Sequence, residues 1–325
     1  MYIFNSRKKL VVKAAGFLCL LIVSLSMINS CYVKRNVCDN DRTAKFKSIK
    51  PGILISNTGS SHGLYGFNYD DFESRYNCFN FALESQSLSY DYRVISEYRD
   101  YLAEGGVMFI TVSFFSLYGM DELDQEEFES KNYRYYKILS PGKIKEYCWK
   151  DDLKYHIFPV TNDEDLLKTF VEGKQTGEAW QKAWYLNAAE SGNLESDAQN
   201  AYERHYVKNA NMINHRKVNE EEYAALFDII ALCKSKNIRP VIITTPVTMA
   251  YKEKINQNFL NGFYDDMGEI TAETGAEYYD YSGDQRIVSH LSFFMNADHL
   301  NCEGALEFTK ILKEEIVDKE YGEED

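Results

Sequence analysis

Residues 293–305 read FFMNADHLNCEGA, and the rest of the chain is organised around them. This segment places an acid and an imidazole, Asp298 and His299, just before a predicted amphipathic helix. A second segment far upstream, residues 57–63, reads NTGSSHG and follows an apolar run. A hydroxyl after a first strand and a histidine before a last helix are typical of a serine nucleophile and its base. The pair predicts Ser61 as the nucleophile and His299 as the base.

The composition of the chain limits the classes of protein to which it can belong. The chain has 325 residues, of which 45% are hydrophobic and 26% charged, so it has the composition of a globular protein. Its net charge of −14 argues against a nucleic acid partner, because phosphate binding needs a basic surface. The seven cysteines include no CxxC pair, and their spacing indicates no compact disulfide framework. We therefore expect no metal site and no cofactor.

The N-terminal segment, residues 1–31, is expected to lie outside the folded domain. Basic residues precede an apolar run at 14–28, which is close to the minimum length for crossing a bilayer. The basic flank should remain cytoplasmic, which places the remainder of the chain outside the cytoplasm. Three alternatives stay open: an uncleaved signal anchor, a lipoprotein signal ending at Cys31, and an ordinary cleaved signal. Residues 32–50 are polar and basic, as in a linker to the membrane.

Strands and helices alternate regularly in two parts of the remaining chain. Short apolar strands are predicted at 53–57, 76–82, 107–113, 239–245 and 276–281. Helices are predicted at 90–102 with Ser89 as its cap, at 220–236, at 249–274 with a break near Gly262, and from the DH pair to about 317. This alternation predicts a three-layer, flavodoxin-like α/β domain over 51–320, with about five parallel strands and helices on both faces. Functional residues are then expected at the carboxyl ends of the strands.

Residues 121–220 interrupt this alternation with a charged, Tyr-rich and largely helical insertion. We expect it to lie beside the strand ends, so that deleting it should alter substrate choice more than folding. The pair Arg204-His205 is expected on a solvated helix face, with contact to the substrate as the alternative. The aromatic residues at 133–136, together with Trp180 and Trp184, suit either a carbohydrate platform or packing in the core.

The two motifs resemble those of the SGNH/GDSL hydrolase superfamily. Its Gly-Asp-Ser block is matched by Gly59-Ser60-Ser61, and its closing Asp and His before the last helix are matched by residues 296–299. The resemblance covers about 51–116 and 236–317, and it leaves the insertion unmatched. Exported members provide the nearest likeness, among them DltD-like proteins and polysaccharide O-acetyltransferases. The resemblance implies an α/β hydrolase domain with a Ser-His-acid site.

The chain departs from the superfamily pattern at the acid and at the oxyanion hole. The superfamily acid lies three residues before the histidine, where this chain has Asn296, and the carboxylate is instead Asp298. Asp298 reaches the ring of the next residue only if the backbone turns there, and Asn296 is the alternative orienting group. A further alternative makes Asp298 the cap of the last helix. The oxyanion or substrate-binding positions are expected among Gly59, His62, Ser85 and Ser113.

These residues lead to two functional hypotheses. The first is a membrane-anchored, extracytoplasmic serine esterase or O-acyltransferase of the acetyl ester class, acting on cell-envelope or extracellular polysaccharide. Its partners would be the acylated glycan and a membrane-bound acyl donor protein. The second is a tethered binding or assembly protein that keeps the fold with weakened chemistry. Asn296 at the acid position supports this alternative.

Overall fold

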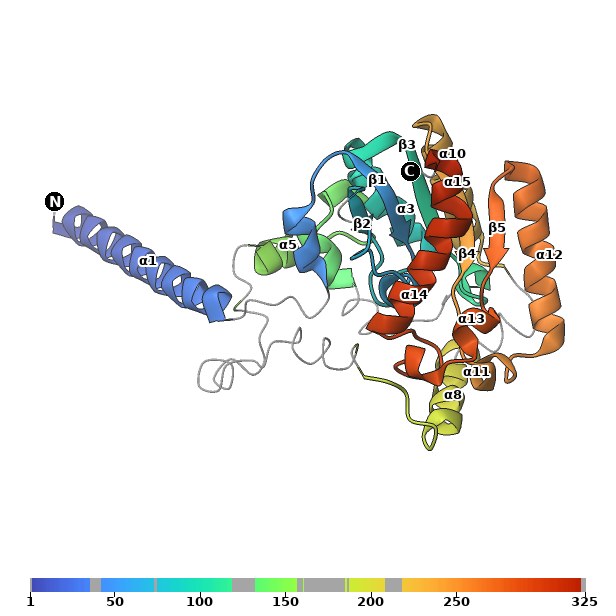
Figure 1. Cartoon of the computed structure of the whole chain (residues 1–325). Coiled ribbons are helices and arrows are strands. Elements are labelled where there is room, and N and C mark those ends of the chain that lie inside the picture. Colours follow the sequence, from blue (N-terminus) through green and yellow to red (C-terminus); the bar gives the residue numbers. More distant parts are fainter. Residues whose placement is uncertain are drawn as a thin grey trace.

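The structure is a computed structural model, and it describes residues 2–35, 42–72, 75–118, 132–156, 160, 185, 187–207 and 218–322. It contains one α/β body, with the N-terminal helix α1 (Tyr2–Arg35) standing apart from that body (Figure 1).

Five parallel strands form the central sheet. In spatial order they are β2 (Cys78–Asn80), β1 (Ile53–Thr58), β3 (Leu102–Thr111), β4 (Arg239–Thr244) and β5 (Glu277–Asp280). Every neighbouring pair is parallel. The order β2-β1-β3-β4-β5 is the flavodoxin-like arrangement, so the predicted fold class is confirmed.

Helices cover both faces of this sheet, because its central strands are apolar on both sides. Along β3, Met108 and Ile110 belong to one buried cluster, and Val107 and Phe109 belong to the other. The first face packs against α3 (Leu88–Glu97), α10 (Glu220–Ser235) and α12 (Gln257–Thr274). The second face packs against α14 (Cys302–Leu312), which follows the short helix α13 (Gln285–Val288) and the 3-10 turn η8 (Leu291–Phe293). After α14 the chain continues through a π-turn, η9 (Lys313–Val317), and α15 (Asp318–Tyr321).

The predicted helix at 90–102 has the wrong boundaries. Helix α3 ends at Glu97, a 3-10 turn η2 (Arg99–Tyr101) follows, and β3 begins at Leu102. The predicted cap Ser89 is also wrong: Ser87 caps the helix, while Ser89 donates its hydroxyl to Oε1 of Glu222 at 2.7 Å. A long-range bond to a buried carboxylate has therefore replaced the local capping bond expected from sequence.

Two further boundaries differ from the prediction. The second strand is reduced to β2, because only three residues pair with β1. The long helix is interrupted between α11 (Met249–Lys252) and α12, where Asn256 caps the second helix, and not near Gly262, which is buried within α12. The Asn256 side chain accepts from the Asn258 N–H and starts α12, so the break lies at a polar N-cap and not at the glycine.

The described parts of the insertion are mainly helical and contribute to the core. They comprise η4 (Tyr133–Lys137), η5 (Pro141–Lys143), α5 (Trp149–His156), α8 (Leu194–Tyr202) and the π-turn η7 (Glu203–Val207). Tyr135 is 1% exposed and stacks on Tyr90 with ring centroids 3.6 Å apart, so this part of the aromatic cluster is core. Trp180 and Trp184 lie outside the described residues.

The N-terminal segments combine a membrane-length helix with a docked linker. One stretch in the described chain, Lys8–Tyr32 of α1, is long and apolar enough to cross a membrane, with a mean hydropathy of 2.3. Its apolar window has no buried residues, as expected for a membrane anchor or a signal sequence. The predicted linker is partly ordered against the body, because η1 (Thr43–Ser48) inserts Phe46 into the core.

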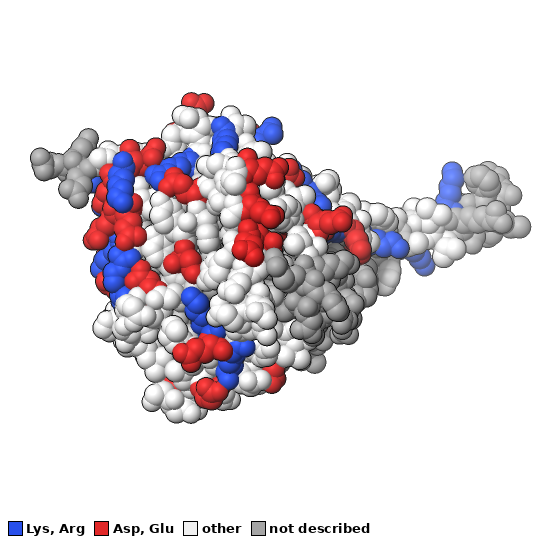
Figure 2. All heavy atoms as spheres, turned by 90° about the vertical axis from the view of Figure 1, so that its right-hand side faces the viewer, with Lys and Arg blue, Asp and Glu red and all other residues white. Residues whose placement is uncertain are grey.

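Surface charge and cysteines agree with the composition. Acidic and basic side chains are interspersed over the face shown in Figure 2. The described cysteines, which exclude Cys38, are all free thiols, and Cys233 is buried. Two short turns complete the described elements: α2 (Ser61–Gly66), which begins at the predicted nucleophile, and η3 (Ser116–Tyr118) after β3.

Candidate active site

A sharp turn after β1 presents Ser61 at the carboxyl edge of the sheet. Gly59 has φ +132°, and a Cβ placed on it would lie 2.7 Å from Cβ of Thr111, so this position accepts only glycine. The Gly59 N–H donates to Oδ1 of buried Asp91 at 3.0 Å, which fixes the turn from below. Ser61 then begins α2 and is half-buried. The hydroxyl is therefore held on a rigid corner and remains reachable from solvent.

The predicted base lies in a second turn, formed by residues 294–300. Phe294 and Leu300 form an antiparallel bridge that closes the turn. At its tip, Oδ1 of Asn296 accepts hydrogen bonds from the backbone N–H groups of Asp298 at 3.1 Å and His299 at 2.9 Å. This side-chain cap bends the backbone between the acid and the imidazole. It supplies the turn that a carboxylate next to the histidine needs in order to face its ring.

The start of α14 anchors this turn. Asn301 is the helix N-cap and accepts from the Gly304 N–H at 2.9 Å, so the alternative that Asp298 caps the helix is wrong. Asn301 also donates through Nδ2 to the carbonyl of Ser292 at 2.6 Å. Gly304 permits a close approach, because a Cβ there would lie 2.0 Å from the carbonyl oxygen of Phe293. These contacts hold the start of α14 and the turn that carries His299 in a fixed relative position.

Ser61 and His299 meet across 238 residues of sequence. The Ser61 Oγ lies 2.8 Å from Nε2 of His299. The other ring nitrogen, Nδ1, lies 3.1 Å from Oδ1 of Asn296 and 3.2 Å from Oδ1 of Asp298. Both oxygens are acceptors, so Nδ1 carries the proton and Nε2 is free to accept from the serine hydroxyl. Both sequence candidates for the orienting group therefore face the same nitrogen.

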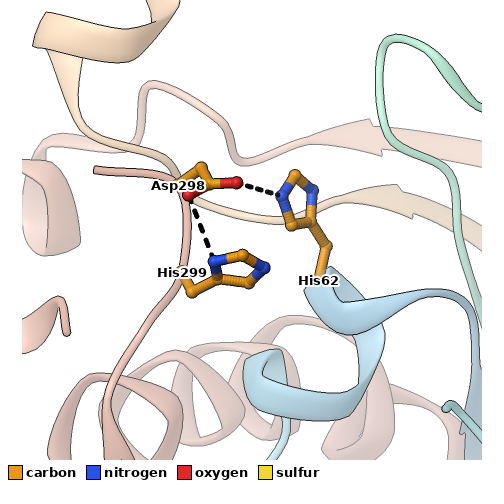
Figure 3. Close-up of side chains that lie close together, drawn as sticks. All are labelled: His62, Asp298 and His299. Atoms are coloured by element: carbon orange, nitrogen blue, oxygen red, sulfur yellow. Dashed lines mark ion pairs between the residues drawn. The ribbon is translucent and has the colours of Figure 1, made fainter. Parts of the chain in front are cut away.

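Asp298 is the centre of a buried polar cluster (Figure 3). Its Oδ1 faces His299, while Oδ2 lies 2.7 Å from Nη2 of Arg204, 3.2 Å from Nε2 of His205 and 3.5 Å from Nε2 of His62. Burial raises the pKa of Asp298, but electrostatic attraction to the His299 ring and hydrogen bonds from His205 and His299 outweigh it and hold that pKa well below its usual value. The carboxylate is thus ionised throughout the physiological range.

The residue after the nucleophile, His62, belongs to this cluster and is almost fully buried. Its Nδ1 lies 2.7 Å from Oγ of Ser113, which comes from the end of β3. Burial lowers the pKa of His62 to about 4, so its ring is neutral at neutral pH. Burial also lowers the pKa of His205, whose ring stacks on Phe115 with centroids 4.0 Å apart.

The predicted oxyanion positions have varied surroundings. The Gly59 N–H is bound to Asp91, and the Ser113 N–H donates to Oγ of Ser116 at 2.9 Å. Ser85 is exposed in the loop after β2 with φ +52°. The Ser61 N–H has no acceptor within its own helix, because it lies in the first turn of α2. Of these groups, the Ser61 amide is best placed to face an oxyanion.

The structure adds two residues that the sequence analysis placed on a solvated helix face. Arg204 and His205 lie on the π-turn η7 of the insertion and contact Asp298 directly. The solvated-face expectation is wrong for His205, whose side chain is only 13% exposed. An Arg-His pair inside a polar segment carries no periodicity or motif that would reveal a long-range contact.

The same cluster has the donor chemistry of a metal site. Ligand atoms of His62, Asp298 and His299 all lie within 4.8 Å of one another. Imidazole nitrogen and carboxylate oxygen are zinc ligands.

Comparison with known proteins adds no assignment: no protein-family model matches the chain, and no curated protein matches it. The chemistry must therefore be argued from the geometry of these residues.

Proposed function

We propose that this protein is a membrane-anchored serine esterase or O-acyltransferase acting on acyl, most simply acetyl, esters of cell-envelope or extracellular polysaccharide. The observation that carries the proposal is the continuous contact from Ser61 through His299 to Asp298. Acid, base and hydroxyl in this order are the arrangement that makes a serine nucleophilic. The glycan class rests on the resemblance to exported SGNH proteins and on the membrane-length helix α1.

The reaction proceeds through an acyl-enzyme. Ser61 Oγ attacks the acyl carbonyl while its proton passes to Nε2 of His299, and the tetrahedral oxyanion faces the Ser61 amide. His299 then returns the proton to the departing oxygen of the acyl donor as the ester C–O bond breaks. Water or a second sugar hydroxyl attacks the acyl-enzyme, gives its proton to His299 and restores Ser61. Asp298 stabilises the imidazolium in both halves of the reaction.

The choice between hydrolysis and transfer depends on the second nucleophile. Both routes use the same acyl-enzyme, and they differ in whether water or a glycan hydroxyl reaches it. A membrane-bound acyl donor protein would be the source of the acyl group in the transfer route. Incubating the acyl-enzyme with an oligosaccharide acceptor and measuring free acid against acylated sugar separates the two routes.

Labelling by a fluorophosphonate probe tests the nucleophile in the full chain. We expect the wild-type protein to be labelled and Ser61→Ala to remain unlabelled. Ser60→Ala is the matched control, because Ser60 is the neighbouring hydroxyl and its side chain makes no capping bond to α2. Labelling that persists in Ser61→Ala, or labelling that is lost in Ser60→Ala alone, contradicts the assignment.

The location of the catalytic domain is tested separately. The basic residues before the apolar segment of α1 favour an extracytoplasmic catalytic domain. Protease added to intact cells should then degrade the domain, whereas a cytoplasmic control protein remains intact. If Cys31 carries a lipid, Cys31→Ser should release the protein from the membrane; an uncleaved anchor should be unaffected.

A second candidate, a tethered binding protein with weakened chemistry, has one observation in its favour. Two backbone N–H groups expected at the oxyanion hole, those of Gly59 and Ser113, donate within the protein instead. This candidate predicts no probe labelling of the wild type together with retained glycan binding. Ester turnover by the wild-type protein that disappears in Ser61→Ala excludes it.

A further inference from the structure

We propose that His62, His205 and Asp298 form a binding site for a divalent transition metal ion, with zinc as the ion that best suits these ligands. The site lies beside the proposed catalytic residues and uses the carboxylate oxygen that does not face His299. The existence of this site does not depend on the proposed function.

The distances from two imidazole nitrogens to one carboxylate oxygen carry the proposal. Both Nε2 atoms point at the same oxygen, Oδ2 of Asp298, at 3.5 Å for His62 and 3.2 Å for His205. Tetrahedral zinc with ligand bonds of about 2.0–2.2 Å separates its ligand atoms by about 3.3–3.6 Å. The first distance is long for a hydrogen bond, and the buried Nε2 of His62 has no hydrogen-bond partner among the described residues. An ion between these atoms would satisfy that nitrogen.

The two rings are already held in place. The Nδ1 of His62 contacts the hydroxyl of Ser113, which orients the ring and accepts a hydrogen bond from Nδ1–H when Nε2 binds metal. The ring of His205 stacks on Phe115 at an interplanar angle of 6°. Side chains of His62 and Asp298 are 4% and 1% exposed.

Arg204 determines when the site is open. Its Nη2 lies 2.7 Å from the same Oδ2, and a guanidinium and a metal ion cannot occupy that position together. The Arg204 side chain is 49% exposed, so it can swing into solvent without unfolding its surroundings. Arg204 and zinc therefore compete for one carboxylate oxygen. The competition predicts that substitutions of the two adjacent residues, Arg204 and His205, change the zinc affinity in opposite directions.

Zinc titration of the full chain in detergent micelles, followed by calorimetry, measures the site. We expect His205→Ala to weaken zinc binding at least tenfold, because a ligand is removed, and Arg204→Gln to strengthen it, because the competing cation is removed. Ser113→Ala should weaken binding by about tenfold through the orientation of His62. His290→Ala is the matched control, because His290 is an exposed histidine that is not one of the proposed ligands, and the zinc affinity of this variant should not change.

The result of the zinc titration is independent of the result of the probe-labelling experiment on Ser61. Ser61→Ala should bind zinc like the wild type while losing probe labelling, so either result can fail without the other. Wild-type zinc binding weaker than about 0.1 mM overturns the metal site. So does an Arg204→Gln variant, folded by circular dichroism, that binds zinc no better than the wild type. The Arg204 result keeps the proposal falsifiable even if His205→Ala does not fold.

Discussion

Nε2 of His205 lies 3.2 Å from Oδ2 of Asp298, although 93 residues separate them. The contact joins the insertion to the turn that holds the proposed base. The described parts of the insertion also bury Tyr135, Ala198 and Tyr206 in the core of the first sheet face. We therefore no longer expect deletion of 121–220 to leave the fold intact: it should unfold the domain, as circular dichroism would show.

Packing of the insertion against the body is tested by Tyr206→Ala. Tyr206 is 3% exposed and packs edge-on against Phe259 of α12. Removing a buried aromatic ring costs about 3–5 kcal/mol of unfolding free energy, through lost burial and the cavity left behind. Chemical denaturation measures this cost. The control is the next residue, Val207, which is 52% exposed, so Val207→Ala should change stability by less than about 0.5 kcal/mol. Equal effects of the two changes would place the insertion outside the core.

The orienting acid is tested by comparing Asp298→Asn with Asn296→Ala. We expect Asp298→Asn to lower kcat/KM for ester hydrolysis more, because a buried negative charge stabilises the imidazolium of His299 better than an amide dipole does. Asn296→Ala should act mainly by loosening the turn, since Oδ1 of Asn296 accepts from two backbone N–H groups. Asn296→Asp preserves those acceptors and should stay near wild-type activity. A larger loss in Asn296→Ala than in Asp298→Asn would assign the orienting role to Asn296.

The base itself is tested by His299→Ala. Without a base within 2.8 Å, the Ser61 hydroxyl is a poor nucleophile. We expect kcat/KM for ester hydrolysis to fall by about 10²–10⁴-fold, the range typical of acid–base catalysis. A fall smaller than about tenfold would mean that another group accepts the serine proton.

Gly304 couples the last helix to the base-bearing turn. In Gly304→Ala the new methyl group would lie 2.0 Å from the Phe293 carbonyl oxygen, so the start of α14 must shift. We expect a loss of about 1–3 kcal/mol of stability, together with reduced probe labelling of Ser61 because the turn moves. The measurements are thermal unfolding and labelling rate.

Gly268 provides the matched control for this change. It is exposed within α12 and has no atom within 4 Å of an added Cβ. Gly268→Ala should stabilise the protein by about 0.4–1 kcal/mol, because alanine restricts the unfolded chain more than glycine does. If both substitutions stabilise, the close packing at Gly304 is contradicted.

Asp91 should make the stability of the protein fall as pH rises. Burial raises the pKa of this carboxyl to about 7, against hydrogen bonds from Thr58, Gln86 and the Gly59 N–H, while its value in the unfolded chain is near 3.8. Between about pH 4 and pH 7 the native state holds a proton that the unfolded state has released. The contribution of Asp91 to stability is thus full below pH 4, declines on the order of 4 kcal/mol up to pH 7, and is level above that.

Asp91→Asn removes this titration and keeps an oxygen for the same donors. The difference in unfolding free energy between the wild type and Asp91→Asn, measured by denaturation from pH 4 to pH 8, should therefore shift steadily in favour of the variant up to about pH 7. Taking the difference cancels the titration of other carboxyls. A difference that does not change with pH would show that Asp91 is ionised in the native state throughout.

The fold could largely be predicted from local patterns. The continuous apolar runs around residues 53–57, 107–113 and 239–245 had the length and composition of buried parallel strands, and they form the centre of the sheet. The ends of helices were less predictable where a distant side chain competed with a local backbone group for the same hydrogen-bonding partner. Ser89 is such a case, because the carboxylate of Glu222 takes the hydroxyl that would otherwise cap the helix.

For the candidate site, local patterns were enough to predict which groups stand at the strand ends. Ser61 follows the first strand and Asp298-His299 precede the last helix, and in a parallel sheet those positions meet at one edge. How Asp298 approaches the ring of His299, and which side chains surround it, depends on contacts that form only in the folded chain. The Asn296 cap bends the backbone enough for adjacent Asp298 to reach the ring, and Arg204 and His205 arrive from the insertion. A buried carboxylate must be compensated by nearby donors, and donors brought together by folding over such separations leave no trace in sequence spacing.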